Sequence, residues 1–286
     1  MATRALVVGG TGGIGYAIAC RIAAESNSST VIISGRNKPS EIRHANMEFR
    51  PLDASSMRSI KQYTDAYKST PEKSLDLLVL TQGILTTAGR TETPEGIDRK
   101  MALHFYGRQL LIRELLPALK DDAKVIIVLD GLRGKSPTSL NWEDLDLKTH
   151  YGLPAAANHC ISMTDAMIQA HAARQKEQNL GRRHFVHAYP GVVNTKIVEC
   201  LPWYMRGPTR VLTGLLGVSP DVCAEHLCKG SYEAAAAGEK EGRFWSCIDD
   251  KGRLVPNKPV WSEEQIKKVE EHTWKVVDDA LKTPAS

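Results

Sequence analysis

The sequence predicts an α/β protein built on a doubly wound parallel sheet of about seven strands, with helices on both faces. Three observations support this fold class. Short runs of apolar and β-branched residues recur along the chain, as in strands that are covered on both faces. Helical segments separate most of these runs, which indicates right-handed βαβ crossovers. A glycine-rich turn directly follows the first run, and such a turn is typical of sheets of this kind.

The strands and helices are expected in alternation. The expected strands cover residues 6–8, 30–36, 47–53, 75–80, 124–129, 184–189 and 243–248. The expected helices cover residues 16–24, 57–68, 96–120, 155–175 and 263–281. The last helix begins with Ser262-Glu-Glu-Gln265, which has the pattern of a capping box.

Two further segments lack a clear pattern. Residues 131–150 are expected to form an irregular insertion. Residues 196–217 are apolar and irregular, and core packing is one interpretation of them. Because they follow the end of the sixth strand, where a cover over the cleft would attach, we interpret them as a candidate substrate lid.

Composition narrows the classes of protein. With 286 residues, 42% of them hydrophobic and 24% charged, the chain is expected to form one domain over residues 1–286. A net charge of +4 without a Lys/Arg-rich block gives no support for a nucleic-acid partner. The six scattered cysteines form no C-x-x-C pair, so no metal site is expected. Without a membrane-spanning run or a signal peptide, the expected location is cytoplasmic, and a homo-oligomer is left open.

The glycine-rich turn predicts a phosphate-binding site. Gly9, Gly13 and Gly15 allow a tight turn, a close approach of backbone to a pyrophosphate, and close packing of helix on strand. The phosphates would lie at the N-terminus of the following helix, where free N–H groups and the helix dipole favour negative charge. Thr11 and Ile14 belong to the same turn and are counted with the expected cofactor-binding residues.

Three strand ends together resemble the short-chain dehydrogenase/reductase family. Val8-Gly-Gly-Thr-Gly-Gly-Ile-Gly15 is similar to its Thr-Gly-x-x-x-Gly-Ile-Gly fingerprint, and Leu80-Thr-Gln-Gly83 stands where Asn-Asn-Ala-Gly is usual. Pro190-Gly-Val-Val-Asn-Thr195 resembles the family's Pro-Gly-x-x-x-Thr turn. The resemblance covers nearly the whole chain. It implies a Rossmann-type fold and a nicotinamide cofactor, with contacts from Gly83, Pro190, Gly191, Val193 and Thr195.

The residues after the second strand favour NADP(H) over NAD. An acidic residue there would accept a hydrogen bond from the ribose 2′-hydroxyl and repel a 2′-phosphate. The chain instead has Arg36, Asn37 and Lys38, and the planar guanidinium of Arg36 suits a phosphate. Asp53, counted with the adjoining Ala54, resembles the family residue that holds the adenine.

The catalytic half departs from the family pattern. The resemblance implies a Tyr-x-x-x-Lys pair, but Tyr151 is followed by Ala155 in the lysine position, and residues 151–173 contain no lysine. Asp130 stands in the position of the family's serine, and His104 in that of its asparagine. The usual proton donor is therefore missing, whereas the cofactor motifs are kept.

This contrast points to the nature of the hydride acceptor. Hydride addition to a carbonyl produces an alkoxide that must be protonated, whereas addition to an iminium produces a neutral amine. A cationic acceptor would be stabilised by carboxylates, and we expect Asp165 and Asp130 to serve. Arg133 could pair with either acid or orient a substrate carbonyl. His104 is more often a packed core residue than a catalyst, and Tyr151 is a proton donor if the insertion folds back over the site.

Three stretches resemble a divergent subgroup, the fungal bifunctional reductase/Diels–Alderases of prenylated indole alkaloid pathways. They are residues 83–96, 142–148 and 157–160, the last leading to Asp165. The resemblance implies NADPH reduction of a cyclic iminium or zwitterionic alkaloid intermediate, followed by an intramolecular [4+2] cycloaddition. Trp203, Tyr204 and the rest of the lid could shape the pocket that this step needs. Two alternatives stay open: a carbonyl reductase that uses Tyr151, and a non-catalytic NADP(H)-binding regulatory protein.

Overall fold

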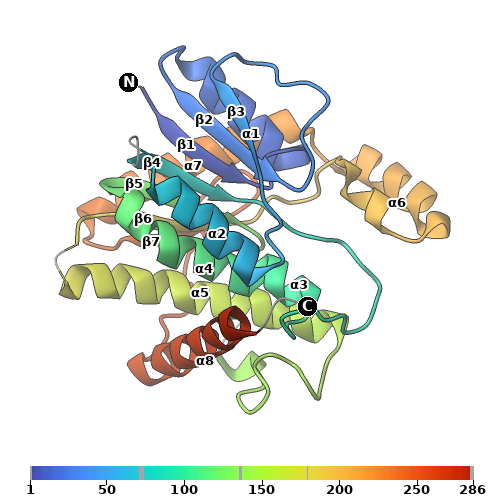
Figure 1. The fold of residues 1–286 in the computed structure, drawn as a ribbon, viewed down its shortest axis with the longest axis vertical. Coiled ribbons are helices and arrows are strands. Elements are labelled where there is room, and N and C mark those ends of the chain that lie inside the picture. Colours follow the sequence, from blue (N-terminus) through green and yellow to red (C-terminus); the bar gives the residue numbers. More distant parts are fainter. Residues whose placement is uncertain (1, 71–73, 135–136, 179, 284–286) are drawn as a thin grey trace.

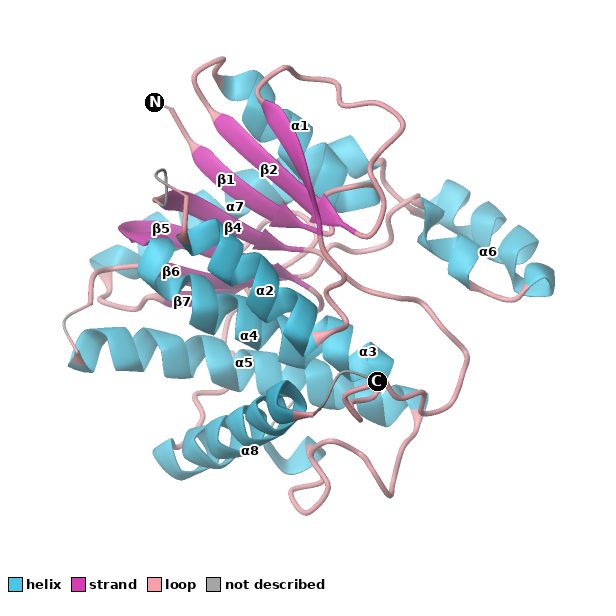
Figure 2. Cartoon of the chain, in the orientation of Figure 1, coloured by secondary structure: helices cyan, strands magenta, loops and turns pink. Residues whose placement is uncertain are grey.

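A seven-stranded, all-parallel sheet forms the centre of the molecule (Figures 1 and 2). The computed structural model describes residues 2–70, 74–134, 137–178 and 180–283. The strands lie in the order β3-β2-β1-β4-β5-β6-β7, which confirms the predicted doubly wound fold. Their bounds are β1 (Arg4–Val8), β2 (Thr30–Gly35), β3 (Met47–Pro51), β4 (Leu75–Leu80), β5 (Leu119–Val128), β6 (His184–Ala188) and β7 (Trp245–Ile248).

Eight α-helices are found in the described part of the chain. They are α1 (Gly13–Glu25), α2 (Met57–Lys68), α3 (Arg99–Met101), α4 (Gly107–Leu115), α5 (Leu153–Glu177), α6 (Trp203–Leu216), α7 (Pro220–Lys240) and α8 (Glu263–Lys282). A π-helical turn, Ala102–Tyr106, joins α3 to α4. Shorter 3-10 turns lie at Leu116–Ala118, Pro137–Ser139 and Lys196–Cys200. The predicted capping box of Ser262 and Gln265 is present at the start of α8.

Two hydrophobic cores lie on the two faces of the sheet. On one face α1 and α7 pack against alternate strand residues such as Val7 and Val79. On the other face α2, α4, α5 and α8 pack against the intervening residues, among them Leu78 and Leu80. Because successive strand side chains point to opposite faces, both cores draw on the same strands, which is why the strands are apolar throughout.

Three expectations about helices are wrong in detail. The helix predicted over 96–120 begins at Arg99, because Asp98 caps it by accepting a hydrogen bond from the N–H of Met101. Residues 196–217 are not irregular, since they form the turn Lys196–Cys200 and helix α6. Helix α7 has no counterpart among the predicted elements, although Ser219 caps it and Pro220 opens it, as is usual for a helix start.

Helix α6 differs from the others in its surroundings. It projects from the body of the molecule in Figure 1, and none of its residues is buried. The expected insertion at 131–150 contains one short turn, Pro137–Ser139, and residues 135–136 lie outside the described part. No described helix has both the length and the apolar character that crossing a membrane requires.

Candidate functional site

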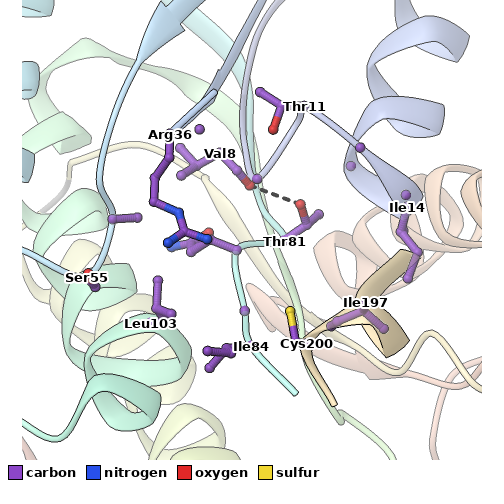
Figure 3. Close-up of a pocket in the computed structure, with 18 of the residues that line it drawn as sticks. Val8, Thr11, Ile14, Arg36, Ser55, Thr81, Ile84, Leu103, Ile197 and Cys200 are labelled. Atoms are coloured by element: carbon purple, nitrogen blue, oxygen red, sulfur yellow. Dashed lines mark hydrogen bonds between the residues drawn. The ribbon is translucent and has the colours of Figure 1, made fainter. Parts of the chain in front are cut away.

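A cavity of about 440 Å³ lies at the carboxyl ends of β1, β2 and β4 (Figure 3). This is the edge at which parallel α/β sheets bind their ligands. Figure 3 shows Arg36, Ser55 and Leu103 at one end of the cavity and Ile14, Ile197 and Cys200 at the other. Residues of the glycine-rich turn line the wall between these ends.

The glycines of the turn are required by close backbone approaches. Gly9 has a φ of +82°, and a Cβ built there would lie 2.6 Å from the amide nitrogen of Gln82. A Cβ at Gly15 would lie 2.4 Å from the carbonyl oxygen of Gly9 and equally near Thr81 Oγ1. Thr81 also donates a hydrogen bond to the Val8 carbonyl. The end of β4 therefore packs directly against the turn after β1.

The N-terminus of α1 opens onto the cavity without a side-chain cap. Gly12 precedes the helix and supplies no side chain, so the first helical N–H groups have no capping partner. Gly13, Ile14 and Gly15 all line the cavity. Thr195 closes this region, because its Cγ2 lies 3.3 Å from the position of a Cβ at Gly13. Free N–H groups and the helix dipole make this an anion site.

The charged side chains of the wall are mainly cationic. Arg36, Arg99 and Lys196 line the cavity, and their side chains form no hydrogen bond or ion pair with the described residues. Asp53 is the acidic residue of the wall, and its Oδ1 accepts hydrogen bonds from the N–H and hydroxyl of Ser55. The positive excess complements a ligand with several phosphates.

Most of the expected cofactor-binding residues meet on this wall. They are Gly9, Thr11, Gly13, Ile14, Gly15, Arg36, Asp53, Ala54, Gly83 and Thr195. Asn37, Pro190, Gly191 and Val193 are not among the lining residues. Gly191, with a φ of +70°, and Val193, which pairs with Val218, instead shape the loop that leads to Thr195.

Asp165 lies in a buried ion-pair cluster and not on the cavity wall. Its Oδ2 accepts a hydrogen bond from Lys258 Nζ at 2.7 Å, and its Oδ1 accepts one from His187 Nδ1 at 2.6 Å. Burial raises the pKa of Asp165, but the contacts with His187 and Lys258 outweigh burial and hold it below its usual value. The side chain of Asp165 is buried and does not line the cavity, so its expected role as stabiliser of a cationic acceptor stays a prediction.

The same cluster reaches the end of β5. The Asp130 N–H donates to His187 Nε2 at 3.1 Å, so the ring hydrogen of His187 is on Nδ1, facing Asp165. Cys247 Sγ lies 3.5 Å from Asp165 Oδ1, which groups three side chains of metal-binding type. The ammonium group of Lys258 occupies the open side of the carboxylate, so the cluster is a hydrogen-bonded support for the β5 end.

Asp130 and Arg133 lie at the edge of the sheet, beyond β5. Arg133 N–H donates to Asp130 Oδ1 at 2.9 Å, and the guanidinium lies 3.6 Å from Asp130 Oδ2. The guanidinium also donates to Tyr189 Oη at 2.7 Å and stacks on the tyrosine ring at 5.0 Å. Arg133 therefore pairs with Asp130 and not with Asp165.

His104 and Tyr151 are engaged elsewhere. His104 Nε2 accepts a hydrogen bond from the Ile84 N–H at 3.0 Å, and burial with the charges of Arg108 and Lys100 lowers its pKa to about 3. His104 thus shapes the turn after Gly83 and is neutral at pH 7, so it does not act as an imidazolium acid. Tyr151 is not among the lining residues, and burial with the nearby charge of Asp98 raises its pKa to about 12.

Arg99 has no counterpart in the sequence predictions, and Lys196, Ile197 and Cys200 were expected only as part of the candidate lid. Arg99, Lys196, Ile197 and Cys200 line the cavity, and Lys196 could have been found as a cation next to Thr195. Tyr189 was also not among the predicted site residues, although it directly precedes the predicted Pro190-Gly191 turn. A contact between an arginine and a tyrosine has no characteristic spacing in sequence. The same is true of a single arginine at the start of a helix, such as Arg99.

The candidate lid stands open. In α6 the side chains of Trp203 and Leu215 are 81% and 78% exposed, and no α6 residue lines the cavity. Only the preceding turn reaches the wall, through Lys196, Ile197 and Cys200. The predicted role of 196–217 as a lid therefore stays a prediction.

Comparisons with known proteins agree with this geometry. Residues 3–138 match the family model described as short chain dehydrogenase. The chain is 35% identical over 209 residues to a protein named oxidoreductase AN1596 from Emericella nidulans. That match covers 68% of this chain and 59% of the relative, so the chain spans under two thirds of the relative's length.

Solved structures share the fold at low sequence identity. A short chain dehydrogenase family protein from Francisella tularensis is 18% identical, with a TM-score of 0.62 over 87% of this chain and 98% of that one. An NADPH-bound carbonyl reductase from chicken fatty liver is also 18% identical, with a TM-score of 0.58 over 89% of this chain and 98% of that one. Both similarities concern the fold.

Proposed function

Because the chain belongs to the short-chain dehydrogenase/reductase family, we propose that it is an NADP(H)-dependent oxidoreductase acting on a small molecule. The observation that carries the proposal is the cationic cavity at the uncapped N-terminus of α1. A bound nicotinamide would supply a hydride. The six free cysteines support a reducing, cytoplasmic location.

The residues present fit this cofactor. The backbone of Gly13 to Gly15 would hold the pyrophosphate, since no side chain caps these N–H groups. Arg36 would bind the 2′-phosphate, since its guanidinium has no partner in the described residues and no acidic side chain stands beside it at the β2 end. Asp53, with Oδ2 still free, would accept from the adenine amino group.

Titration of NADPH and NADH into the protein tests this proposal. We expect NADPH to bind at least about tenfold more tightly, since one charge-assisted contact is worth about 1.5–3 kcal/mol. Equal affinity for both cofactors would contradict the proposed role of Arg36 in binding the 2′-phosphate. Absence of binding would refute the proposed function.

For the acceptor, we propose first a cyclic iminium or zwitterionic indole alkaloid intermediate, with a [4+2] cycloaddition after reduction. Support comes from the missing Tyr-x-x-x-Lys pair and from the resemblance to the fungal alkaloid enzymes. The exposed aromatic residues Trp203 and Tyr204 would help to enclose the substrate if α6 closes. The carboxylate nearer to solvent is Asp130, whose partner Arg133 is exposed, whereas the side chains of Asp165 and its partner Lys258 are both buried.

A carbonyl acceptor is the second candidate, and one observation favours it. Tyr189 and Arg133 place a phenol and a cation in contact at the sheet edge, which is what protonation of an alkoxide requires. Turnover of a preformed cyclic iminium without turnover of the matching ketone would support the first acceptor. Turnover of the ketone alone would exclude it.

A further inference from the structure

The ends of β5 and β6, next to the strands that form the cofactor cavity, carry a phenol group that the proposed cofactor contacts do not involve. Leu80 of β4 pairs with Ile127 of β5, and Ile127 pairs with His187 of β6. Gly83, Asp130 and Pro190 each follow these residues by three positions and so leave the sheet in one row. Neighbouring strands lie about 4.8 Å apart, so the ends of β5 and β6 follow that of β4, after which Gly83 lines the cavity; Asp130, Tyr189 and Pro190 are themselves not among its lining residues.

The hydrogen bonds at this edge leave one donor free. Tyr189 Oη accepts the hydrogen bond of Arg133 Nη2 at 2.7 Å, so the lone pairs of the phenol oxygen face the cation. Its own O–H has no acceptor among the described residues. Arg133 is held in turn by Asp130, through the backbone N–H at 2.9 Å and the guanidinium at 3.6 Å.

Buried groups hold the backbone of Asp130 in place. Its N–H binds His187, whose ring is fixed by Asp165, and Asp165 is paired with Lys258. The chain of contacts from Lys258 to Tyr189 thus ends on a phenol at the surface. The buried groups in this series of contacts all have hydrogen-bond partners, whereas the O–H of Tyr189 at its outer end has none among the described residues.

Three apolar residues, which we call the apolar rim, follow the same strand ends in the sequence. One exposed apolar side chain follows each of β4, β5 and β6: Leu85 is 38% exposed, Leu132 is 41% exposed, and Val192 is 45% exposed. Ligand sites combine an apolar lining with a few placed polar groups. A rim of this kind beside one free phenol suits an apolar substrate that carries a single oxygen acceptor.

We propose that Tyr189 is the proton donor for a carbonyl substrate and that Arg133 positions it, in place of the missing Tyr-x-x-x-Lys pair. This inference rests on the proposed function, which supplies the hydride, and takes its second candidate acceptor, a carbonyl. As the new C–H bond forms, the π pair of the C=O bond moves to oxygen, and the proton of Tyr189 goes to that oxygen to give the alcohol. Arg133 stabilises the phenolate that remains, and water returns its proton.

Substitution of Tyr189 by Phe, assayed with two probes of similar size, tests the inference. With tetralone as the ketone, we expect Tyr189→Phe to lower kcat at least about a hundredfold, as for loss of a general acid. With N-methyl-dihydroisoquinolinium, whose reduction needs no proton, we expect kcat to change less than about threefold. NADPH affinity, measured by fluorescence, should stay that of the wild type. Tyr232→Phe, on α7, is the matched control.

Arg133 needs a readout that separates positioning from folding. Arg133→Met should lower the ketone kcat without lowering the iminium kcat, and Arg133→Lys should restore part of the ketone kcat because it keeps the charge. Equal ketone turnover by Tyr189→Phe and wild type would overturn the inference. So would loss of turnover in Tyr151→Phe alone, or wild-type activity on the iminium ion without any on tetralone. A wild type that fails to bind NADPH would refute the proposed function instead.

Discussion

The cofactor cavity and the Asp165 cluster differ in what their charged groups contact. On the cavity wall Arg36 and Arg99 form no ion pair with the described residues. In the cluster both carboxylate oxygens of Asp165 are hydrogen-bonded, and the whole group is buried. A charge left unpaired at an accessible wall is available to a ligand, whereas a buried pair is already satisfied and is costly to break by removing one partner. Among the predicted site residues, Arg36 falls in the first class and Asp165 in the second.

Removing Asp165 should produce the largest loss of stability. In Asp165→Ala the Lys258 ammonium stays buried without a partner, so we expect the free energy of unfolding to fall by about 3–5 kcal/mol. Urea denaturation followed by circular dichroism measures it. The double variant Asp165→Leu with Lys258→Met removes both charges and should lose less. A loss below about 1 kcal/mol in Asp165→Ala would show that the cluster is not a structural support.

The same carboxylate should make stability depend on pH. The pKa of Asp165 is lowered in the folded protein, so its contribution is fully present above the unfolded-chain value of about 3.9. The contribution is lost as the pH falls through the folded-state pKa. The urea midpoint of the wild type should therefore fall toward that of Asp165→Asn in acid. A constant difference between the two proteins from neutral pH to well below pH 3 would contradict this.

Gly9→Ala should produce the largest loss of cofactor affinity. The new Cβ would lie 2.6 Å from Gln82 N at a φ of +82°, so the turn must move away from the pyrophosphate. We expect NADPH affinity to fall by about a hundredfold, or about 2.7 kcal/mol. Gly89→Ala, where no heavy atom lies within 4 Å of the added Cβ, is the control. Near-normal affinity in a folded Gly9→Ala protein would place the phosphates elsewhere.

Arg36→Ala should weaken NADPH about tenfold and leave NADH almost unchanged, because only NADPH carries the 2′-phosphate. Lys38→Ala is the matched control, since Lys38 follows the same strand but does not line the cavity. Calorimetric titration of both cofactors measures the difference. Equal weakening of both would mean that Arg36 supports the turn and does not read the phosphate.

The smallest effect is expected in α6. Trp203→Ala combined with Leu215→Ala should change the free energy of unfolding by less than about 0.5 kcal/mol, because both side chains are exposed. If α6 closes as a lid, the same variant should raise the substrate KM several-fold without changing NADPH affinity. An unchanged KM would end the interpretation of 196–217 as a lid.

The fold and the cofactor wall could be predicted because their signals are local in sequence. The turn from Gly9 to Gly15 follows its strand directly, and the strands can be recognised from their apolar composition. Asp165 could not be placed in this way. Its helix was predicted, but its partner Lys258 comes from a loop 93 residues away that no spacing reveals.

Helices α6 and α7 differ in whether their local sequence predicts a helix. Gly207, Pro208 and Gly214 disfavour a helix, but α6 forms there with Pro208 in its interior. In α7 the local signals were present: Ser219 caps the helix and Pro220 opens it. The start of α7 was therefore predictable from the sequence.

The central claim is that the cavity at the N-terminus of α1 binds NADP(H). Isothermal titration of NADPH and NADH into the wild-type protein, repeated with Gly9→Ala, tests it most directly. We predict one NADPH bound per chain, at least about tenfold weaker binding of NADH, and loss of the NADPH signal in the variant. Wild-type protein that binds neither cofactor, or a Gly9→Ala variant that binds NADPH as the wild type does, would contradict the claim.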